Sequence, residues 1–188
     1  MANRTTTAQK VVNGVDVQKL GETIKQLSKQ PDLARFRFRA RNRWSGDGGL
    51  NKTTIDGLYG AGQEHPHKKP FELQADEPEV LAGKDRAANP VEHLLNALVT
   101  CLTTSMVYHA AARGIRLEEV ESQIEGDIDL RGFTGVSPDV RKGYEKLRVT
   151  FKVKSDAPAA QLRECALFSP VFDSLTRGVP IDLTIEKK

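Results

Sequence analysis

The stretch that decides the fold is residues 89–114, NPVEHLLNALVTCLTTSMVYHAAARG. Between Pro90 and Gly114 it holds no proline or glycine, and apolar or small side chains occur nearly all the way round a helix drawn through it. A helix that is apolar on every side is a buried one. Asn89 is a favourable N-cap, Pro90 suits the first helical position, and Gly114 suits the C-terminal stop. We therefore predict a buried central helix with Cys101 in its middle.

Two strands are predicted to follow this helix, and their outer faces carry opposite charges. In residues 119–130 the odd positions are mostly acidic, whereas in residues 145–154 the even positions are mostly basic. Most positions between them are apolar, and this period of two is typical of half-buried strands. Opposite charges across an antiparallel pair stabilise its register. The pattern predicts a hairpin with residues 131–143 as its loop.

A helix and a strand are predicted at the start of the chain. Residues 1 to about 13 are polar, and we expect them to be frayed. A short amphipathic helix should begin at Asp16 and end before Pro31. Residues 35–44 then alternate arginines with a second set that includes Phe36, Phe38 and Trp44, which predicts a strand with its apolar side facing inward.

The region between this strand and the central helix is rich in turn residues. The glycines of residues 46–49 predict a turn into a second strand at about 50–58. Residues 59–70, with two glycines and two prolines, predict a long loop, and residues 71–73 a third short strand.

After the hairpin we expect two short helices and a last strand. The first helix, residues 158–167, carries Cys165; the second covers residues 171–176, and residues 181–185 alternate as a half-buried strand. This order predicts the α+β class, with antiparallel sheets wrapped around the central helix. We expect an N-terminal extension over residues 1–31 and one domain over residues 32–188.

Composition excludes several classes of protein. The chain has 188 residues, of which 38% are hydrophobic and 28% charged, which is typical of a globular domain. Its 28 basic and 25 acidic residues nearly cancel, so a broad cationic surface for nucleic acid is not expected. No apolar run follows the first ten residues. We therefore expect no secretory signal and no membrane anchor, and by default a cytoplasmic location.

The two cysteines, Cys101 and Cys165, have no Cys or His neighbours at metal-ligand spacing. They fit two inert thiols, one structural bridge or a redox pair. His65 and His67 flank Pro66, but two ligands without a third are a weak metal signal. We expect no metal and no organic cofactor. A buried thiol without a positive neighbour reacts poorly, so a redox role requires a cation from another segment.

Residues 89–115, together with ECALFSPVFDSLTRGVPI at residues 164–181, resemble the OsmC/Ohr family of thiol-dependent peroxidases. In that family Asn-Pro opens a buried helix that carries the peroxidatic cysteine. A second cysteine precedes a Ser-Pro-Val-type helix and the last strand. The layout matches from about residue 33 to the end.

The resemblance implies a two-cysteine mechanism. Cys101 would attack either an organic hydroperoxide or hydrogen peroxide, and its sulfur would become a sulfenic acid. Cys165 would resolve it as a disulfide, which an external thiol reductant reopens. The resemblance also implies an intertwined homodimer with its active sites at the interface.

An arginine from an early strand stabilises the thiolate in the family, so Arg41 and Arg43 are the candidates. The other interpretation of these arginines is a solvated or acid-paired outer face. The family glutamate directly follows Asn-Pro, where this chain has Val91, and Glu92 comes about 100° further round the helix. Glu92 is thus either a site residue or only an acid at the helix N-terminus.

Two rival functions remain on this pattern. One is a non-catalytic small-molecule-binding protein on the same scaffold, holding an apolar molecule over an unreactive Cys101. The other, weaker one is nucleic-acid binding through the strand of residues 35–43.

Overall fold

The computed structural model describes residues 11–187, which divide into two compact units, each taken here by itself. Unit 1 comprises residues 16–94 and unit 2 comprises residues 11–15 and 95–187, so the division falls inside the central helix. The predicted domain boundary near residue 31 stays a prediction. Of the N-terminal segment expected to be frayed, residues 1–10 lie outside the described residues, whereas β1 (Val11–Val12) pairs with β2 (Val15–Asp16).

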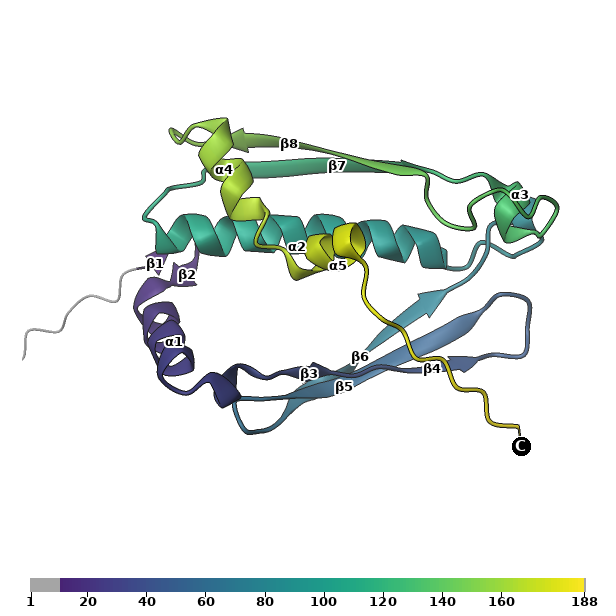
Figure 1. Ribbon diagram of the computed structural model, residues 1–188, viewed down its shortest axis with the longest axis horizontal. Helices are drawn as coiled ribbons and strands as arrows, with labels where there is room; N and C mark the ends of the chain where they lie inside the picture. Colours follow the sequence, from purple (N-terminus) through teal and green to yellow (C-terminus); the bar gives the residue numbers. More distant parts are fainter. Residues whose placement is uncertain (1–10, 188) are drawn as a thin grey trace, which may run out of the picture. The chain divides into compact units, whose positions relative to one another are not determined.

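Unit 1 is built on one long antiparallel hairpin, β5 (Asn51–Gly60) with β6 (Gln63–Ala75). The other edge of β5 pairs with two short strands in turn, β3 (Arg37–Phe38) and β4 (Arg41–Trp44) (Figure 1). The predicted first strand is therefore two short strands, and the second strand is confirmed.

The loop predicted over residues 59–70 is wrong, because most of it belongs to β5 and β6. Ala61 and Gly62 adopt positive φ angles of 47° and 80°, which closes the turn within a few residues. The two prolines, Pro66 and Pro70, lie in β6, which pairs with β5 alone among the strands of residues 11–187. An edge strand tolerates proline, since its outward side needs no ladder hydrogen bond.

One face of this sheet is apolar and open. Trp44 is 64% exposed and Phe38 75% exposed, so the predicted inward apolar side is wrong within this unit. In the strand register, Leu73 and Phe71 lie on the same face as Trp44, and both are exposed. This set, Trp44, Phe71 and Leu73, is called the apolar sheet face below.

Helix α1 (Val17–Lys29) confirms the predicted N-terminal helix. The Asp16 carboxylate accepts a hydrogen bond from the Lys19 amide (2.9 Å), and a 3₁₀ turn, η1 (Pro31–Ala34), follows the helix. No residue of α1 is fully buried, so its apolar stripe is only partly covered.

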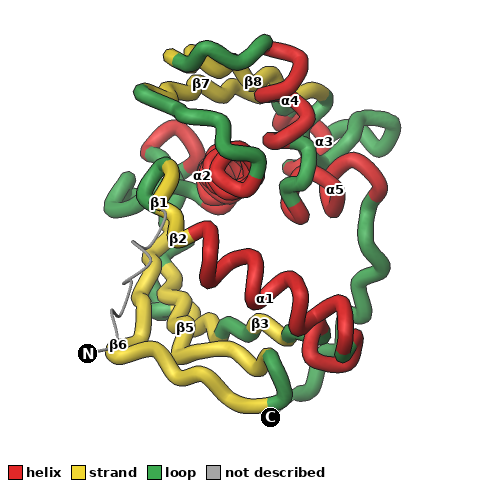
Figure 2. Tube along the Cα trace, turned by 90° about the vertical axis from the view of Figure 1, so that its left-hand side faces the viewer, coloured by secondary structure: helices red, strands yellow, loops and turns green. Residues whose placement is uncertain are grey.

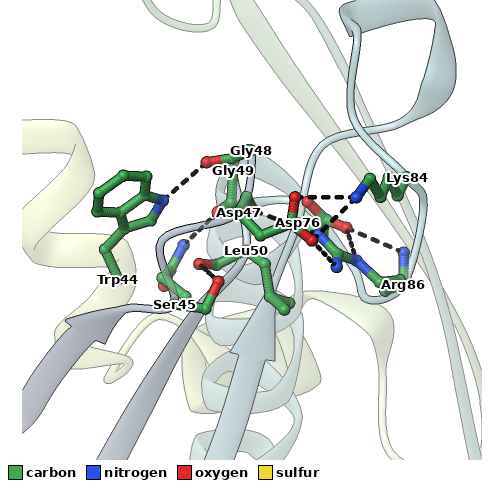
Figure 3. A network of polar contacts seen from close by, with 10 residues as sticks. Trp44, Ser45, Asp47, Gly48, Gly49, Leu50, Asp76, Lys84 and Arg86 are labelled. Carbon is green, nitrogen blue, oxygen red and sulfur yellow. Dashed lines mark hydrogen bonds and ion pairs between the residues drawn. The ribbon is translucent and has the colours of Figure 1, made fainter.

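A polar network connects the β4–β5 turn to the segment before the central helix (Figure 3). The buried Asp76 carboxylate accepts a hydrogen bond from Arg86 Nε (2.7 Å). Arg86 Nη1 and Lys84 Nζ both donate to Asp47 in the turn, at 2.7 and 2.9 Å. Nearby, η2 (Glu79–Leu81) brings Gly83 so close to the Glu77 carbonyl that a Cβ there would lie 1.8 Å from its oxygen.

The central helix is α2 (Pro90–Ala112), as predicted. Within unit 2, its face of Leu98, Leu102, Met106 and Ala110 is buried in the apolar core of the unit. Figure 2 shows the helix end-on, beneath the two strands of residues 119–127 and 146–154. Thr100, Thr104 and Tyr108 are exposed. The helix is thus buried on one side rather than all round, because unit 2 covers only that side.

The predicted hairpin of opposite charges is confirmed, although its first strand ends at Asp127 rather than at Leu130. Strand β7 (Glu119–Asp127) pairs with β8 (Lys146–Lys154), and the register sets acidic residues of β7 opposite basic ones of β8: Glu119 with Lys154, Glu121 with Lys152, Glu125 with Arg148, and Asp127 with Lys146. Arg148 bonds both Glu125 and Asp127, and this holds the pKa of Asp127 below its usual range. A short helix, α3 (Leu130–Phe133), lies in the connection.

Helices α4 (Ala159–Ala166) and α5 (Pro170–Arg177) confirm the two predicted short helices. The last predicted strand is wrong: residues 180–187 are extended but belong to no strand. Ile181, Leu183 and Ile185, the apolar tail residues, are more than 80% exposed. A strand needs an edge to pair with, and no described strand pairs with this segment.

The overall class is α+β, with antiparallel sheets and helices, as predicted. Among the described helices, α2 is long and apolar enough to span a membrane by length and composition. Core helices meet the same criterion, and α2 packs one face against the core of unit 2.

Candidate active site

A reciprocal cap fixes the start of the helix that carries Cys101. The Asn89 amide donates to Glu92 Oε2 (2.8 Å), and the Glu92 amide donates to Asn89 Oδ1 (2.9 Å). This is a capping box, with a glutamate in the position of its usual acidic partner. The Glu92 carboxylate is therefore engaged with the helix N-terminus, while its predicted role in the site stays a prediction.

Cys101 lies about halfway along α2 as a free, partly exposed thiol. Its position is about 60–100° round the helix from the buried residues Leu98 and Leu102. The thiol is thus at the border of the packed face rather than at its centre. That border also carries the exposed Thr104.

Cys165 is a free thiol of a different kind, because it is completely buried (0% exposed). It lies in α4, within the apolar cluster of Leu102, Met106 and Ala110. Arg113, just beyond the end of α2, donates from Nη1 to Cys165 Sγ at 2.9 Å. A cation from a segment 52 residues away therefore lies beside the second cysteine, whereas the cation expected beside Cys101 stays a prediction.

An aromatic side chain holds this guanidinium in place. Arg113 lies over the ring of Phe168, with 5.4 Å between the guanidinium carbon and the ring centroid. The His109 ring stacks on the same Phe168 ring, with centroids 3.9 Å apart. Burial, and then the charge of Arg113, lower the pKa of His109, so its imidazole is neutral near pH 7.

The two sulfur atoms are not within bonding distance. His109 follows Cys101 by eight residues, which is about 12 Å along a helix axis. Arg113 Nη1 lies 3.4 Å from the His109 carbonyl oxygen and 2.9 Å from Cys165 Sγ. Together these two contacts span about 6 Å, which is less than the distance of about 12 Å between Cys101 and His109, so the two sulfur atoms are at least about 5 Å apart. In a disulfide the two sulfur atoms are about 2 Å apart. A bond between them therefore requires that at least one of the two cysteines moves.

The predicted arginines, Arg41 and Arg43, belong to β4 in unit 1. Arg41 pairs with Asp56 at 2.5 Å, which agrees with the acid-paired interpretation of this face. Arg43 makes no ion pair with any residue that the structure describes. Which of them serves a thiolate stays a prediction.

The histidines of β6 have structural partners. His65 Nε2 lies 3.0 Å from the Gly60 carbonyl oxygen, and the His67 and Phe71 rings form a T-shaped contact with centroids 4.8 Å apart. Over residues 11–187, no cluster of three metal-ligating side chains is found.

An apolar hollow of about 580 Å³ lies in unit 2. Side chains of α2, β8, α4 and α5 line it, among them Leu102, Phe151, Leu162 and Phe172. Among the described lining residues, Arg163 is the one charged group. The hollow has the character of a small-molecule site, apolar with a single polar group.

Comparisons with known proteins agree with this architecture. The family model described as OsmC-like protein matches residues 83–184, more than half of the chain. A search of the curated proteins finds no match. Among solved structures, the chain is similar to an OsmC-like protein from Mycoplasma pneumoniae, at 16% identity and a TM-score of 0.53, over 76% of this chain and 89% of that one. It is also similar to an OsmC-like protein of unknown function from Vibrio cholerae, at 12% identity and a TM-score of 0.53, over 73% and 92% of the two chains.

Proposed function

This chain belongs to the OsmC-like protein family, and from that premise we propose that it is a thiol-dependent peroxidase acting on organic hydroperoxides or hydrogen peroxide. The observation that carries the proposal is the place of Cys101. It is a free, partly exposed thiol midway along the central helix of the matched region.

In the proposed reaction the Cys101 thiolate attacks one oxygen of the peroxide. The sulfur–oxygen bond forms as the oxygen–oxygen bond breaks, and an alcohol or water leaves with the second oxygen. The sulfur has lost two electrons and is now a sulfenic acid. Cys165 then displaces the hydroxyl to give a disulfide, and an external thiol reductant restores both thiols by exchange.

The exposure of the two thiols fits these separate roles. An attacking cysteine must meet a dissolved peroxide, and Cys101 is the partly exposed one. A resolving cysteine reacts only with another sulfur of the protein, so it needs no exposure to solvent, and Cys165 is buried. Since the sulfurs start at least about 5 Å apart, a movement of one or both cysteines would precede the disulfide.

We propose a homodimer as the working form. The apolar sheet face of unit 1 and the apolar tail residues of unit 2 are exposed to an extent that monomeric proteins avoid. A second copy offers the same surfaces in return, and two copies would cover both. We further propose a cytoplasmic location, where thiol reductants are available.

The apolar hollow in unit 2 supports a second candidate function. A non-catalytic protein of this fold would hold an apolar small molecule there, against Leu102 and Phe151, with both thiols idle.

One reaction separates the two candidates. The fully reduced protein is mixed with one equivalent of cumene hydroperoxide, and its disulfides are mapped by mass spectrometry. The peroxidase yields one equivalent of cumyl alcohol and a Cys101–Cys165 disulfide, whereas the Cys101→Ser variant leaves the peroxide intact. If the wild-type thiols survive while an apolar dye binds the hollow, the binding function replaces the peroxidase.

A further inference from the structure

The contact between Arg113 and Cys165 joins a permanent charge to a thiol that has no access to water. Cys165 is completely buried, so no solvent dipole can stabilise a charge on its sulfur. Arg113 Nη1 lies 2.9 Å from that sulfur. A thiolate beside a guanidinium is stabilised, whereas a thiol in purely apolar surroundings stays protonated and inert.

The charge of Arg113 is not used elsewhere. No described carboxylate forms an ion pair with it, in contrast to Arg86, Arg131 and Arg148. Its remaining contacts are uncharged ones, with the His109 carbonyl oxygen and the Phe168 ring. Among the described residues, the Cys165 sulfur is therefore the one group in contact with this exposed arginine that can carry a negative charge.

The neighbouring ionisable groups do not compete for this role. His109 lies next to the guanidinium and is neutral near pH 7, because burial and the charge of Arg113 lower its pKa. Arg163 and Glu164, which precede Cys165 in α4, are exposed.

We infer that Arg113 is the positioning residue of the resolving step: its guanidinium is placed to stabilise the negative charge on the Cys165 sulfur as that sulfur attacks the oxidised Cys101. This inference rests on the proposed peroxidase function. The Cys165 thiolate donates an electron pair to the sulfenic sulfur of Cys101. The sulfur–sulfur bond forms, the sulfur–oxygen bond breaks, and the hydroxide that leaves takes a proton to become water.

The first test measures the thiolate itself and requires no peroxide. In the Cys101→Ser protein, Cys165 is the one remaining thiol of the chain. Its ultraviolet thiolate absorbance near 240 nm is compared at pH 7 with and without Arg113→Gln, and with Arg113→Lys as the control that keeps the charge. We expect the glutamine variant to lose this absorbance and the lysine variant to retain most of it. Equal absorbance in all three proteins would overturn the inference.

The second test separates resolution from attack. The protein with both cysteines is mixed rapidly with cumene hydroperoxide. The rate of sulfenic acid formation on Cys101 and the rate of disulfide formation are then measured separately. Arg113→Gln should leave the first rate unchanged and slow the second by about tenfold or more, so that sulfenic acid accumulates. Arg113→Lys should restore the second rate. Undiminished disulfide formation in Arg113→Gln contradicts the inference.

The two tests also separate this inference from the proposed function. If Cys101 is never oxidised but the thiolate absorbance depends on Arg113, the peroxidase proposal fails and the role of Arg113 in charging Cys165 stands. If Cys101 is oxidised and its sulfenic acid is resolved at the same rate in Arg113→Gln, the peroxidase proposal stands and the role of Arg113 fails.

Discussion

Asp76 is the residue on which the turn before the central helix depends. Its buried carboxylate bonds Arg86, and Arg86 in turn bonds Asp47 in the β4–β5 turn (Figure 3). The hydrogen bond from Arg86 lowers the pKa of Asp76, and those from Lys84 and Arg86 lower the pKa of Asp47. The β4–β5 turn and a segment 39 residues further along the chain are thereby held together just ahead of α2.

These lowered pKa values give a signed prediction for stability. An aspartate whose pKa is lower in the folded state stabilises the fold above its unfolded pKa of about 3.9, and this contribution is lost as the pH falls further. Asp76→Asn should lower the melting temperature by several degrees at pH 7, and by less at pH 3, where the wild type has also begun to lose its pairs. Thermal unfolding of the variant and the wild type at pH 7 and pH 3 measures both differences in melting temperature.

The exposed Glu79→Gln serves as the control for the removal of a carboxylate. It should unfold like the wild type at both pH values. A constant difference between Asp76→Asn and the wild type across this pH range would contradict the account.

The residues of the site were predictable only in part. Cys101 and Cys165 are candidates from the sequence because the motifs around them, Asn-Pro before an apolar helix and Ser-Pro after the second cysteine, resemble those of the OsmC/Ohr family; their roles stay predictions. Arg113 is not, because its contact with Cys165 joins positions 52 residues apart and no spacing rule connects them. The sequence signal for it is slight: a single basic residue at the C-terminal end of the central helix.

Among the elements, α5 explains why Ser-Pro stands where it does in the chain. Ser169 is buried, and its hydroxyl oxygen accepts a hydrogen bond from the Phe172 amide (3.1 Å). Pro170 occupies the first helical position, where no amide proton is needed. The two residues therefore form the N-terminal cap of α5.

Loss of this cap should cost about 1 kcal/mol of unfolding free energy in Ser169→Ala, measured by urea titration. Ser169→Thr keeps a hydroxyl and should cost less. Ser174→Ala removes a hydroxyl that bonds only the Pro170 carbonyl of the same helix, so it should change the free energy little. Equal losses for Ser169→Ala and Ser174→Ala would show that the cap does not stabilise α5.

Elements with local signals were predicted well, and those that depend on distant partners were not. The β7–β8 hairpin follows from alternating charges that face each other. Strand β6 was missed because its prolines indicate a loop, although an edge strand accommodates them. The last strand was predicted from a correct alternation, yet an alternating segment becomes a strand only beside a sheet edge.

At the scale of the whole molecule, the uncovered apolar surfaces predict self-association. We expect the wild type to sediment as a dimer at micromolar concentration. Leu183→Asp places a charge among the apolar tail residues and should shift the protein toward the monomer. Val80→Asp, at an equally exposed position on η2, is the matched control and should remain dimeric. A monomeric wild type, or a Leu183→Asp variant with undiminished dimer, would contradict this.

The most direct measurement of the central claim is made on Cys101 in the Cys165→Ser protein, where no second thiol can remove a sulfenic acid. The reduced protein is treated with one equivalent of cumene hydroperoxide in the presence of dimedone. The mass of the peptide that contains Cys101 is then measured by mass spectrometry. The account predicts one dimedone adduct on Cys101, formed at the rate at which the hydroperoxide disappears. An unmodified Cys101 beside unconsumed hydroperoxide would contradict it.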